Sequence, residues 1–229
     1  MEVVSWSIGR LGGCAKLPGV SGPRAVDFRP TSEDIAALPV DPLRLLVSAC
    51  IAGVACANDG DSRTQPGTLV ELLSLATVEV TRYCPEHEAF GSPRELCDIV
   101  GGDGFDVLDG LARVLTASGV DWTAGLVDSA ARMVELARRS RVDVAILMDT
   151  SAACGSQVIY DGDRSLGRRV PGQGVCAAAL ARAGVWIISH RDFRSLEVLR
   201  SRVDPSHEPD PDALDYPETE WYRRLFPSR

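Results

Sequence analysis

Residues 142–149 (VDVAILMD) are apolar on both faces of an extended chain, as in a strand buried inside a parallel sheet. Similar short apolar runs predict further strands over 44–51 (RLLVSACI), 77–84 (TVEVTRYC) and 185–189 (VWIIS). Helical patterns lie between and after these runs, over 68–76, 123–141, 174–184 and 191–202. Strands that alternate with helices indicate a three-layer α/β/α, Rossmann-like fold with a mostly parallel sheet.

The alternating pattern defines one predicted domain, residues 44–203. Glycine and proline residues interrupt any helical or strand-like hydrophobic periodicity in residues 1–43. We expect these residues to form an irregular N-terminal extension. Residues 204–229 are acidic and rich in proline, as in a C-terminal tail. Within the domain, residues 85–96 carry two prolines and predict a loop, and residues 106–117 are helical or mixed.

Length and charge narrow the classes of partner. The chain has 229 residues, 45% of them hydrophobic, enough to build a core without disulfide bonds. Its formal net charge of −8 argues against an extended nucleic-acid groove or an anionic membrane surface as partner. No apolar run approaches the roughly 20 residues of a membrane span, and the N-terminus does not read as a secretory signal. The charge is compatible with a small anionic ligand held by a few local donors. Seven cysteines without an export signal predict a reducing compartment, so we expect a cytoplasmic protein.

Three of the seven cysteines fall at one predicted edge of the sheet. Cys50 and Cys84 end two predicted strands, and Cys154 follows a third strand by five residues. Ligands bind beyond the carboxyl ends of parallel strands. Each thiol taken alone could be a small buried residue, which is the commonest fate of a free cysteine. Three thiols at the same edge point to a site instead.

Three thiolates suit a soft metal centre. Structural zinc sites usually use four ligands with a C-x₂-C pair, and the sequence has no such pair. Ordinary ferredoxin spacings are missing too. An iron–sulfur cubane held by three cysteines would keep one iron open, and that iron could act as a Lewis acid for a substrate sulfur atom.

Four segments together resemble the thiouracil desulfurase family, from about Leu45 to about Ser189. They are VSACIAGVACANDG (47–60), CPEHEAFGSPRE (84–95), SAACGSQVIYDG (151–162) and VPGQGVCAAAL (170–180). The resemblance implies a 4Fe–4S cluster on Cys50, Cys84 and Cys154 whose fourth iron takes the sulfur of a thiolated uracil. It also implies catalytic roles for Glu86 and Ser151. The implied activity is hydrolytic, non-redox removal of sulfur from thiouracil, thiouridine or its nucleotide.

The chain departs from the usual family pattern in its loops. Ala57 and Asn58 precede Asp59-Gly60 where the family usually carries Arg-Tyr, and residues 87–90 replace a loop rich in glycine and proline. These changes keep the implied cluster ligands and bear on the identity of the substrate. A non-catalytic or sensory iron–sulfur protein on the same fold is therefore the alternative function.

Further residues have a functional and a structural interpretation. Ser48 lies two residues before Cys50 on its strand and points to the same face, as a substrate contact or as a buried hydroxyl bonded to the backbone. Gly172 and Gly174 precede a helix, where backbone N–H groups could bind a substrate anion or the chain could simply pack tightly. Glu86 could equally be a solvated loop carboxylate, and Ser151 could cap a turn.

Overall fold

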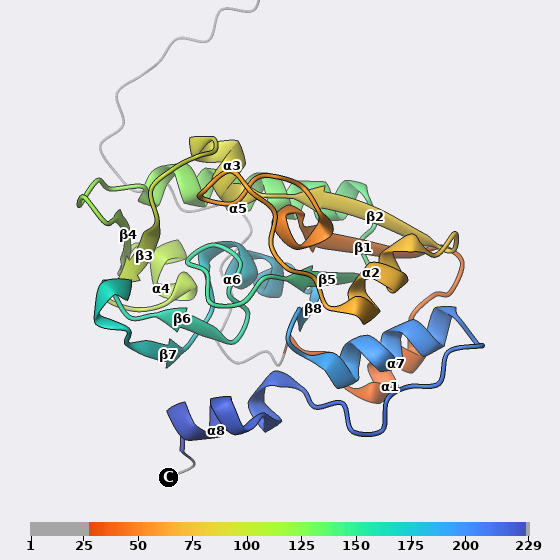
Figure 1. The fold of residues 1–229 in the computed structure, drawn as a ribbon. Coiled ribbons are helices and arrows are strands. Elements are labelled where there is room, and N and C mark those ends of the chain that lie inside the picture. The colour runs from red at the N-terminus through yellow and green to blue at the C-terminus, as the bar shows by residue number, and fades with distance from the viewer. Residues whose placement is uncertain (1–27, 228–229) are drawn as a thin grey trace, which may run out of the picture.

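The structure is a computed structural model that describes residues 28–227, and a four-stranded parallel sheet lies at its centre (Figure 1). The strands are β1 (Leu43–Ser48), β2 (Val78–Tyr83), β5 (Val144–Leu147) and β8 (Trp186–Ser189), in the order β2-β1-β5-β8. In register, Leu45 of β1 pairs with Val80 on one side and with Val144 on the other. Each of the four predicted strands is present, and the predicted parallel sheet is confirmed.

Alternating side chains on the strands create two cores. On β5, Ala145 and Leu147 pack into the core that contains α5 (Thr123–Arg139) and α6 (Val175–Arg182). Val144 and Ile146 point to the opposite core, with α2 (Gly67–Ser74) and α7 (Phe193–Val203). Helices thus cover both faces of the sheet, which confirms the three-layer α/β/α arrangement. None of the helices within residues 28–227 combines the length and apolar character needed to cross a membrane.

A short helix, α1 (Ser32–Ala37), lies inside the segment predicted to be irregular. Its start is a capping box, in which the Thr31 side chain accepts from the N–H of Asp34 and the Asp34 carboxylate accepts from Thr31. Ile35 is buried, and α1 packs beside α7. The prediction of irregular structure is therefore wrong for residues 32–37, whereas residues 1–27 lie outside the described part of the chain.

The predicted loop at 85–96 begins with a helix, α3 (Pro85–Phe90). Pro85 occupies the first helical position, where its fixed φ suits the helix and its missing N–H costs nothing. Glu86 and Glu88 lie in the first turn, where negative charge is favourable, and Gly91 ends the helix with φ of 77°. These local signals produce one short helix without the long apolar period on which the prediction relied.

Two small antiparallel ribbons lie together at one end of the molecule (Figure 1). One pairs β3 (Cys97–Val100) with β4 (Arg113–Thr116), and the other pairs β6 (Val158–Tyr160) with β7 (Arg169–Pro171). Helix α4 (Gly104–Leu108) follows β3, so the segment 106–117, predicted to be helical or mixed, contains the end of this helix and β4.

The C-terminal segment docks on the domain through Tyr216, which is 2% exposed. The N–H of Tyr216 donates to Asp192 at 3.0 Å, and Asp215 accepts from both the N–H and the hydroxyl of Ser195. Helix α8 (Glu220–Leu225) follows, with Trp221 stacked on Tyr216. A buried ring and hydrogen bonds therefore hold at least part of the predicted tail on the domain.

Candidate active site

A cavity of about 80 Å³ opens at the carboxyl ends of β2, β1 and β5, which are neighbours in the sheet. One water needs roughly 10–15 Å³, so the space holds more than a single water. Cys50, Cys84 and Cys154 all line it, together with Glu86 and Ser151. The structure thus brings together five of the residues predicted from the sequence. The other residues that line the cavity are Ala57, Asn58, Arg63, Pro85, Arg94, Leu96, Cys97, Met148, Thr150 and Arg164.

Cys50 lies in a short 3-10 helix, η1 (Ala49–Ala52), that directly follows β1. Its side chain is buried, and its Sγ lies 3.5 Å from Sδ of Met148. Burial raises the pKa of the Cys50 thiol to about 11, and the charges of Cys84 and Glu86 act in the same direction. A cation that binds here must therefore displace a proton from the thiol.

Cys84 joins β2 to α3 and caps that helix. Its Sγ accepts from the N–H of His87 at 3.4 Å and lies 3.6 Å from the carbonyl oxygen of Cys56. The turn from strand to helix directs Glu86, two residues later, into the same cavity. The His87 ring is exposed, and its Nδ1 lies 2.9 Å from the Ser92 hydroxyl, so this histidine does not line the cavity.

Cys154 is placed by a tight turn after β5. The Ser151 hydroxyl accepts from the N–H groups of Ala153 and Cys154 at 3.2 and 3.1 Å. Thr150 has a positive φ of 62°, which is an outlier for a β-branched residue and costs about 1–3 kcal/mol. The buried carboxylate of Asp149 holds this conformation, because its Oδ1 accepts from the N–H of Thr150 at 2.9 Å.

The carboxylate of Glu86 is held at both oxygen atoms. Its Oε2 accepts from Nη2 of Arg94 at 2.7 Å, and its Oε1 accepts from the Ser151 hydroxyl at 3.2 Å. The Glu86 side chain is 19% exposed and that of Arg94 only 4%. Glu86 is therefore an oriented carboxylate inside the cavity and not a solvated loop residue.

Ser151 has the turn-capping role that the sequence offered, and it also lines the cavity. It caps the turn that carries Cys154, and its hydroxyl donates to Glu86. One side chain thus connects a thiol-bearing turn to a carboxylate that comes from another strand end.

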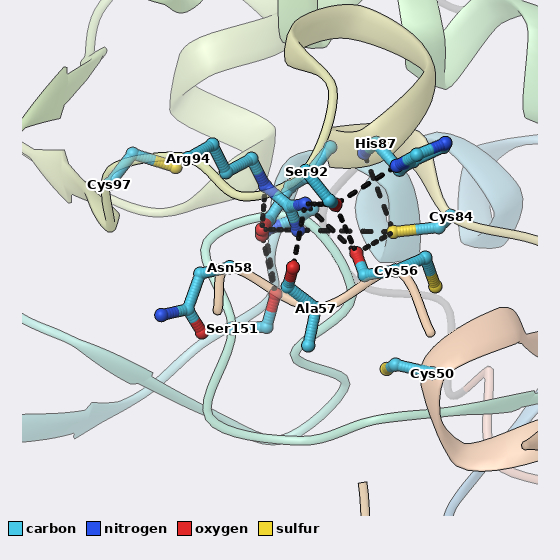
Figure 2. Close-up of polar contacts among 12 residues, drawn as sticks. Cys50, Cys56, Ala57, Asn58, Cys84, His87, Ser92, Arg94, Cys97 and Ser151 are labelled. Carbon is cyan, nitrogen blue, oxygen red and sulfur yellow. Dashed lines mark hydrogen bonds and ion pairs between the residues drawn. The ribbon is translucent and has the colours of Figure 1, made fainter. Parts of the chain in front are cut away.

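Two further cysteines lie close to the cavity. Cys56 is buried, and its carbonyl oxygen accepts from Arg94 and from the Ser92 hydroxyl (Figure 2). Burial raises the pKa of its thiol to about 12, and the neighbouring Cys84 adds to the shift. Cys97, at the start of β3, is buried and lines the cavity.

The side chains around the cavity can be compared with what the 4Fe–4S cluster implied by the family resemblance would need. Within residues 28–227, no three cysteine, histidine or acidic side chains converge closely enough to hold one metal ion. Three separate thiols around a shared cavity do suit a polynuclear iron–sulfur group, because such a group takes each cysteine at a different metal atom. The residues present therefore fit the implied cluster in number and in chemical type.

Ser48, Gly172 and Gly174 do not line this cavity. Ser48 is buried, and its hydroxyl accepts from the N–H of Met148 at 3.1 Å. The N–H groups of Gly172 and Gly174 donate to the carbonyls of Gln157 and Gly155. The Ser48 side chain is also hydrogen-bonded to the Cys154 thiol. All three polar groups thus have partners inside the protein.

The backbone N–H groups at the start of α6 are also hydrogen-bonded within the protein. The N–H groups of Val175 and Cys176 donate to the carbonyl oxygens of Ala152 and Ala153. A Cβ atom added at Gly174 would lie 2.5 Å from the Ala153 oxygen, so the close approach of the two loops requires glycine. The first amides of this helix therefore hold the Cys154 turn and are not offered to an anion in the cavity.

Three arginines that the sequence interpretation missed line the cavity, and each pairs with a carboxylate. The pairs are Arg63 with Asp59 at 2.8 Å, Arg94 with Glu86 at 2.7 Å and Arg164 with Asp98 at 2.7 Å. The Arg63–Asp59 pair has i,i+4 spacing, which the sequence does display. The other two pairs join residues from different elements and have no comparable local signal.

Comparisons with known proteins agree with the arrangement of this site. The family described as 2-thiouracil desulfurase matches residues 45–192, a range that includes every thiol in the cavity. An uncharacterized protein of Bacillus subtilis (strain 168), YbbK, is 36% identical over 153 residues, which cover 66% of this chain and 99% of that protein. A solved structure, the [4Fe-4S]-dependent thiouracil desulfidase TudS, matches with a TM-score of 0.55 and 28% identity, over 64% of this chain and 90% of that chain. The chain therefore belongs to the 2-thiouracil desulfurase family.

Proposed function

We propose that this protein is a 4Fe–4S-dependent desulfurase that removes sulfur hydrolytically from a thiolated pyrimidine. The observation that carries the proposal is the single cavity in which Cys50, Cys84 and Cys154 face Glu86 and Ser151. Family membership supports a desulfurase, and the similarity to TudS supports dependence on a cluster. A purely sensory protein would not need an oriented carboxylate and hydroxyl beside its thiols.

Cys50, Cys84 and Cys154 would hold the cluster. Three protein ligands leave one iron open, and that iron would supply a Lewis acid with a preference for sulfur. The thiols lie beyond the carboxyl ends of three adjacent strands, so the sheet and the turn capped by Ser151 together set their spacing. Each ligand sits on a short, well-bonded turn and not in a long loop.

The expected substrate is a thiouracil, a thiouridine or its nucleotide. The cavity combines the apolar side chains of Leu96 and Met148 with the polar groups of Asn58 and Thr150, a mixture that suits a small polar heterocycle. The net charge of −8 and the small volume argue against an extended nucleic acid.

Glu86 would orient and deprotonate the attacking water. The water oxygen bonds to the carbon that carries sulfur, the carbon–sulfur bond breaks, and sulfur leaves as sulfide. The water oxygen becomes the carbonyl oxygen and both water protons leave with the sulfur as hydrogen sulfide, so no electron donor is consumed. Ser151 would hydrogen-bond the base or pass a proton to and from Glu86, since its hydroxyl already lies 3.2 Å from that carboxylate.

We further propose that the protein works in the cytoplasm. The described chain contains six cysteines without a disulfide bond, and three of them are the proposed cluster ligands. Thiols persist in the reduced form in the cytosol and not in oxidising compartments.

The test is sulfide release by anaerobically purified, cluster-loaded protein. Without added reductant, we expect sulfide and the oxygen analogue of the substrate in equal amounts from at least one of 2-thiouracil, 4-thiouracil and 4-thiouridine monophosphate. The oxygen analogue is uracil for the two free bases and uridine monophosphate for the nucleotide. Cluster-free protein is the control and should release none. A loaded protein that releases no sulfide from any of the three would contradict the proposed activity, and a stoichiometric need for reductant would contradict the hydrolytic scheme.

A further inference from the structure

Arg94 connects separate segments around the cavity (Figure 2). Its Nη1 donates to the carbonyl oxygens of Cys56 at 2.9 Å and Gly91 at 3.0 Å, and to the Ser92 hydroxyl at 2.7 Å. Its Nη2 and Nε donate to Oε2 of Glu86 at 2.7 and 3.3 Å. The guanidinium is thus hydrogen-bonded on several sides although its side chain is only 4% exposed.

These contacts join the chain after β1 to the chain after β2. The N–H of Arg94 also donates to the carbonyl oxygen of Asn58 at 2.7 Å, so main chain and side chain both hold the 56–58 turn. Nη2 lies 3.9 Å from Sγ of Cys84, which places the positive charge beside a proposed cluster ligand. Only a planar group with several N–H donors in a fixed fork can make these contacts together, and a lysine ammonium cannot.

The consequence for Glu86 is a fixed orientation. Arg94 occupies Oε2 and leaves Oε1 directed to Ser151. A carboxylate held by one partner only could rotate, and a small displacement of a reacting group can cost about 10²-fold in rate.

We propose that Arg94 is the positioning residue of this site and acts by fixing the Glu86 carboxylate. The inference rests on the proposed function, because it assigns Arg94 a role in the same reaction. Arg94 is not expected to touch the substrate through the groups described, since these are already bonded within the protein.

The test is a double-mutant cycle with Arg94→Lys and Glu86→Gln. Arg94→Lys should keep the iron and sulfide content and the cluster absorbance, and should lower kcat by about 10²-fold while KM changes by less than about threefold. In the Glu86→Gln background, the same lysine substitution should change kcat by less than about twofold, because there is no carboxylate left to orient. An equal loss in both backgrounds, or wild-type kcat in Arg94→Lys, would overturn the inference.

Arg182 offers a matched control. Its side chain is also 4% exposed and pairs with Asp109 at 2.7 Å, but it does not line the cavity. Arg182→Lys should retain wild-type kcat. If its kcat fell as much as that of Arg94→Lys, the Arg94 effect would be general destabilisation, and the inference would be overturned. If Arg94→Lys does not bind the cluster, Glu86→Asp replaces it in the test, because a shorter carboxylate cannot contact both Arg94 and Ser151. The kcat of Glu86→Asp should fall by about 10²-fold, and an unchanged kcat would overturn the inference.

A measurement without turnover separates this inference from the proposed function. The urea midpoint should fall less in Arg94→Lys/Glu86→Gln than the sum of the two single shifts, because the two groups are direct partners. If the wild type releases no sulfide, the proposed function fails and only the urea cycle tests the pairing of Arg94 with Glu86. Additive shifts of the urea midpoint would overturn this pairing, and non-additive shifts would support it.

Discussion

The Ser151 hydroxyl lies 3.2 Å from Oε1 of Glu86, although 65 positions separate the two residues in the sequence. One follows β5, and the other lies in the first turn of the helix after β2. Their contact makes a polar pair on the wall of a cavity that three thiols also line. This arrangement determines which substitutions should affect chemistry and which should affect the cluster.

Glu86→Gln should retain the cluster and lose activity. The amide keeps the size of the side chain but cannot accept a proton from water, and general base catalysis is typically worth about 10²- to 10⁴-fold. We expect kcat for sulfide release to fall within that range, with a smaller fall for Ser151→Ala. Glu88→Gln, on the same helix but outside the cavity, is the matched control and should keep wild-type kcat. Full activity in cluster-loaded Glu86→Gln would exclude Glu86 as the base.

Replacing Cys50, Cys84 or Cys154 by serine should abolish cluster binding, because each would remove one of three ligands. Iron and acid-labile sulfide, measured after anaerobic reconstitution, should fall from about four each per chain to a small fraction. Cys176→Ala is the control, since Cys176 is fully buried in α6 and does not line the cavity. A serine variant that binds a full complement of iron would remove that cysteine from the proposed ligand set.

His190 should make the protein less stable in mild acid. Its Nδ1 accepts from the N–H of Asp149 at 3.1 Å, and burial lowers its pKa from 6.5 to about 4, with the charge of Arg191 acting in the same direction. The unfolded chain therefore takes up a proton near pH 6.5 and the folded chain only near pH 4. The stability contributed by neutral His190 is complete above pH 6.5 and is lost as the pH falls towards 4, by about 3 kcal/mol.

His190→Asn keeps an acceptor for Asp149 and removes the titration. The free energy of unfolding in urea, wild type minus variant, should fall by about 3 kcal/mol between pH 7 and pH 4. Burial raises the pKa of the neighbouring Asp192 to about 6, which gives the opposite pH slope, but this group is present in both proteins and largely cancels in the difference. A difference that does not change with pH would show that His190 is not a buried neutral group.

Tyr216→Ala should detach the C-terminal segment. The ring is 2% exposed, and truncating a buried aromatic side chain to alanine costs about 3–5 kcal/mol. We expect a loss near the lower end of that range in urea unfolding, with cluster content unchanged below the new melting temperature. Trp221→Ala removes a ring that is 39% exposed and should cost less than about 1.5 kcal/mol. Equal losses in both variants would contradict the role of Tyr216 as the anchor.

The sequence predicted the sheet and its thiol edge because both depend on local patterns. The run at 142–149 is apolar at each position that β5 buries, and Cys50 and Cys84 stand where strands end. Once the strands are parallel and adjacent, their carboxyl ends must meet. The cavity that joins Cys50, Cys84 and Cys154 follows from that topology.

The remaining features depend on contacts between distant segments. Arg94 reads as a loop residue in the sequence, and its role emerges only when the 56–58 turn and Glu86 lie on either side of it. Gly174 looks like a possible anion site until the carbonyl of Gly155 accepts its N–H. Helix α3 escaped prediction because six residues are too few to display a period.

The position of the three thiols beyond the carboxyl ends of β1, β2 and β5 sets an order of assembly for the proposed cluster. These strands are adjacent in the sheet, but the segments that carry Cys50, Cys84 and Cys154 are far apart along the chain. The thiols can meet only after β5 has paired with β1, and therefore only after more than half of the chain has been synthesised. Insertion of the proposed cluster would therefore follow sheet formation, and a chain arrested before residue 154 would carry only two of the three proposed ligands.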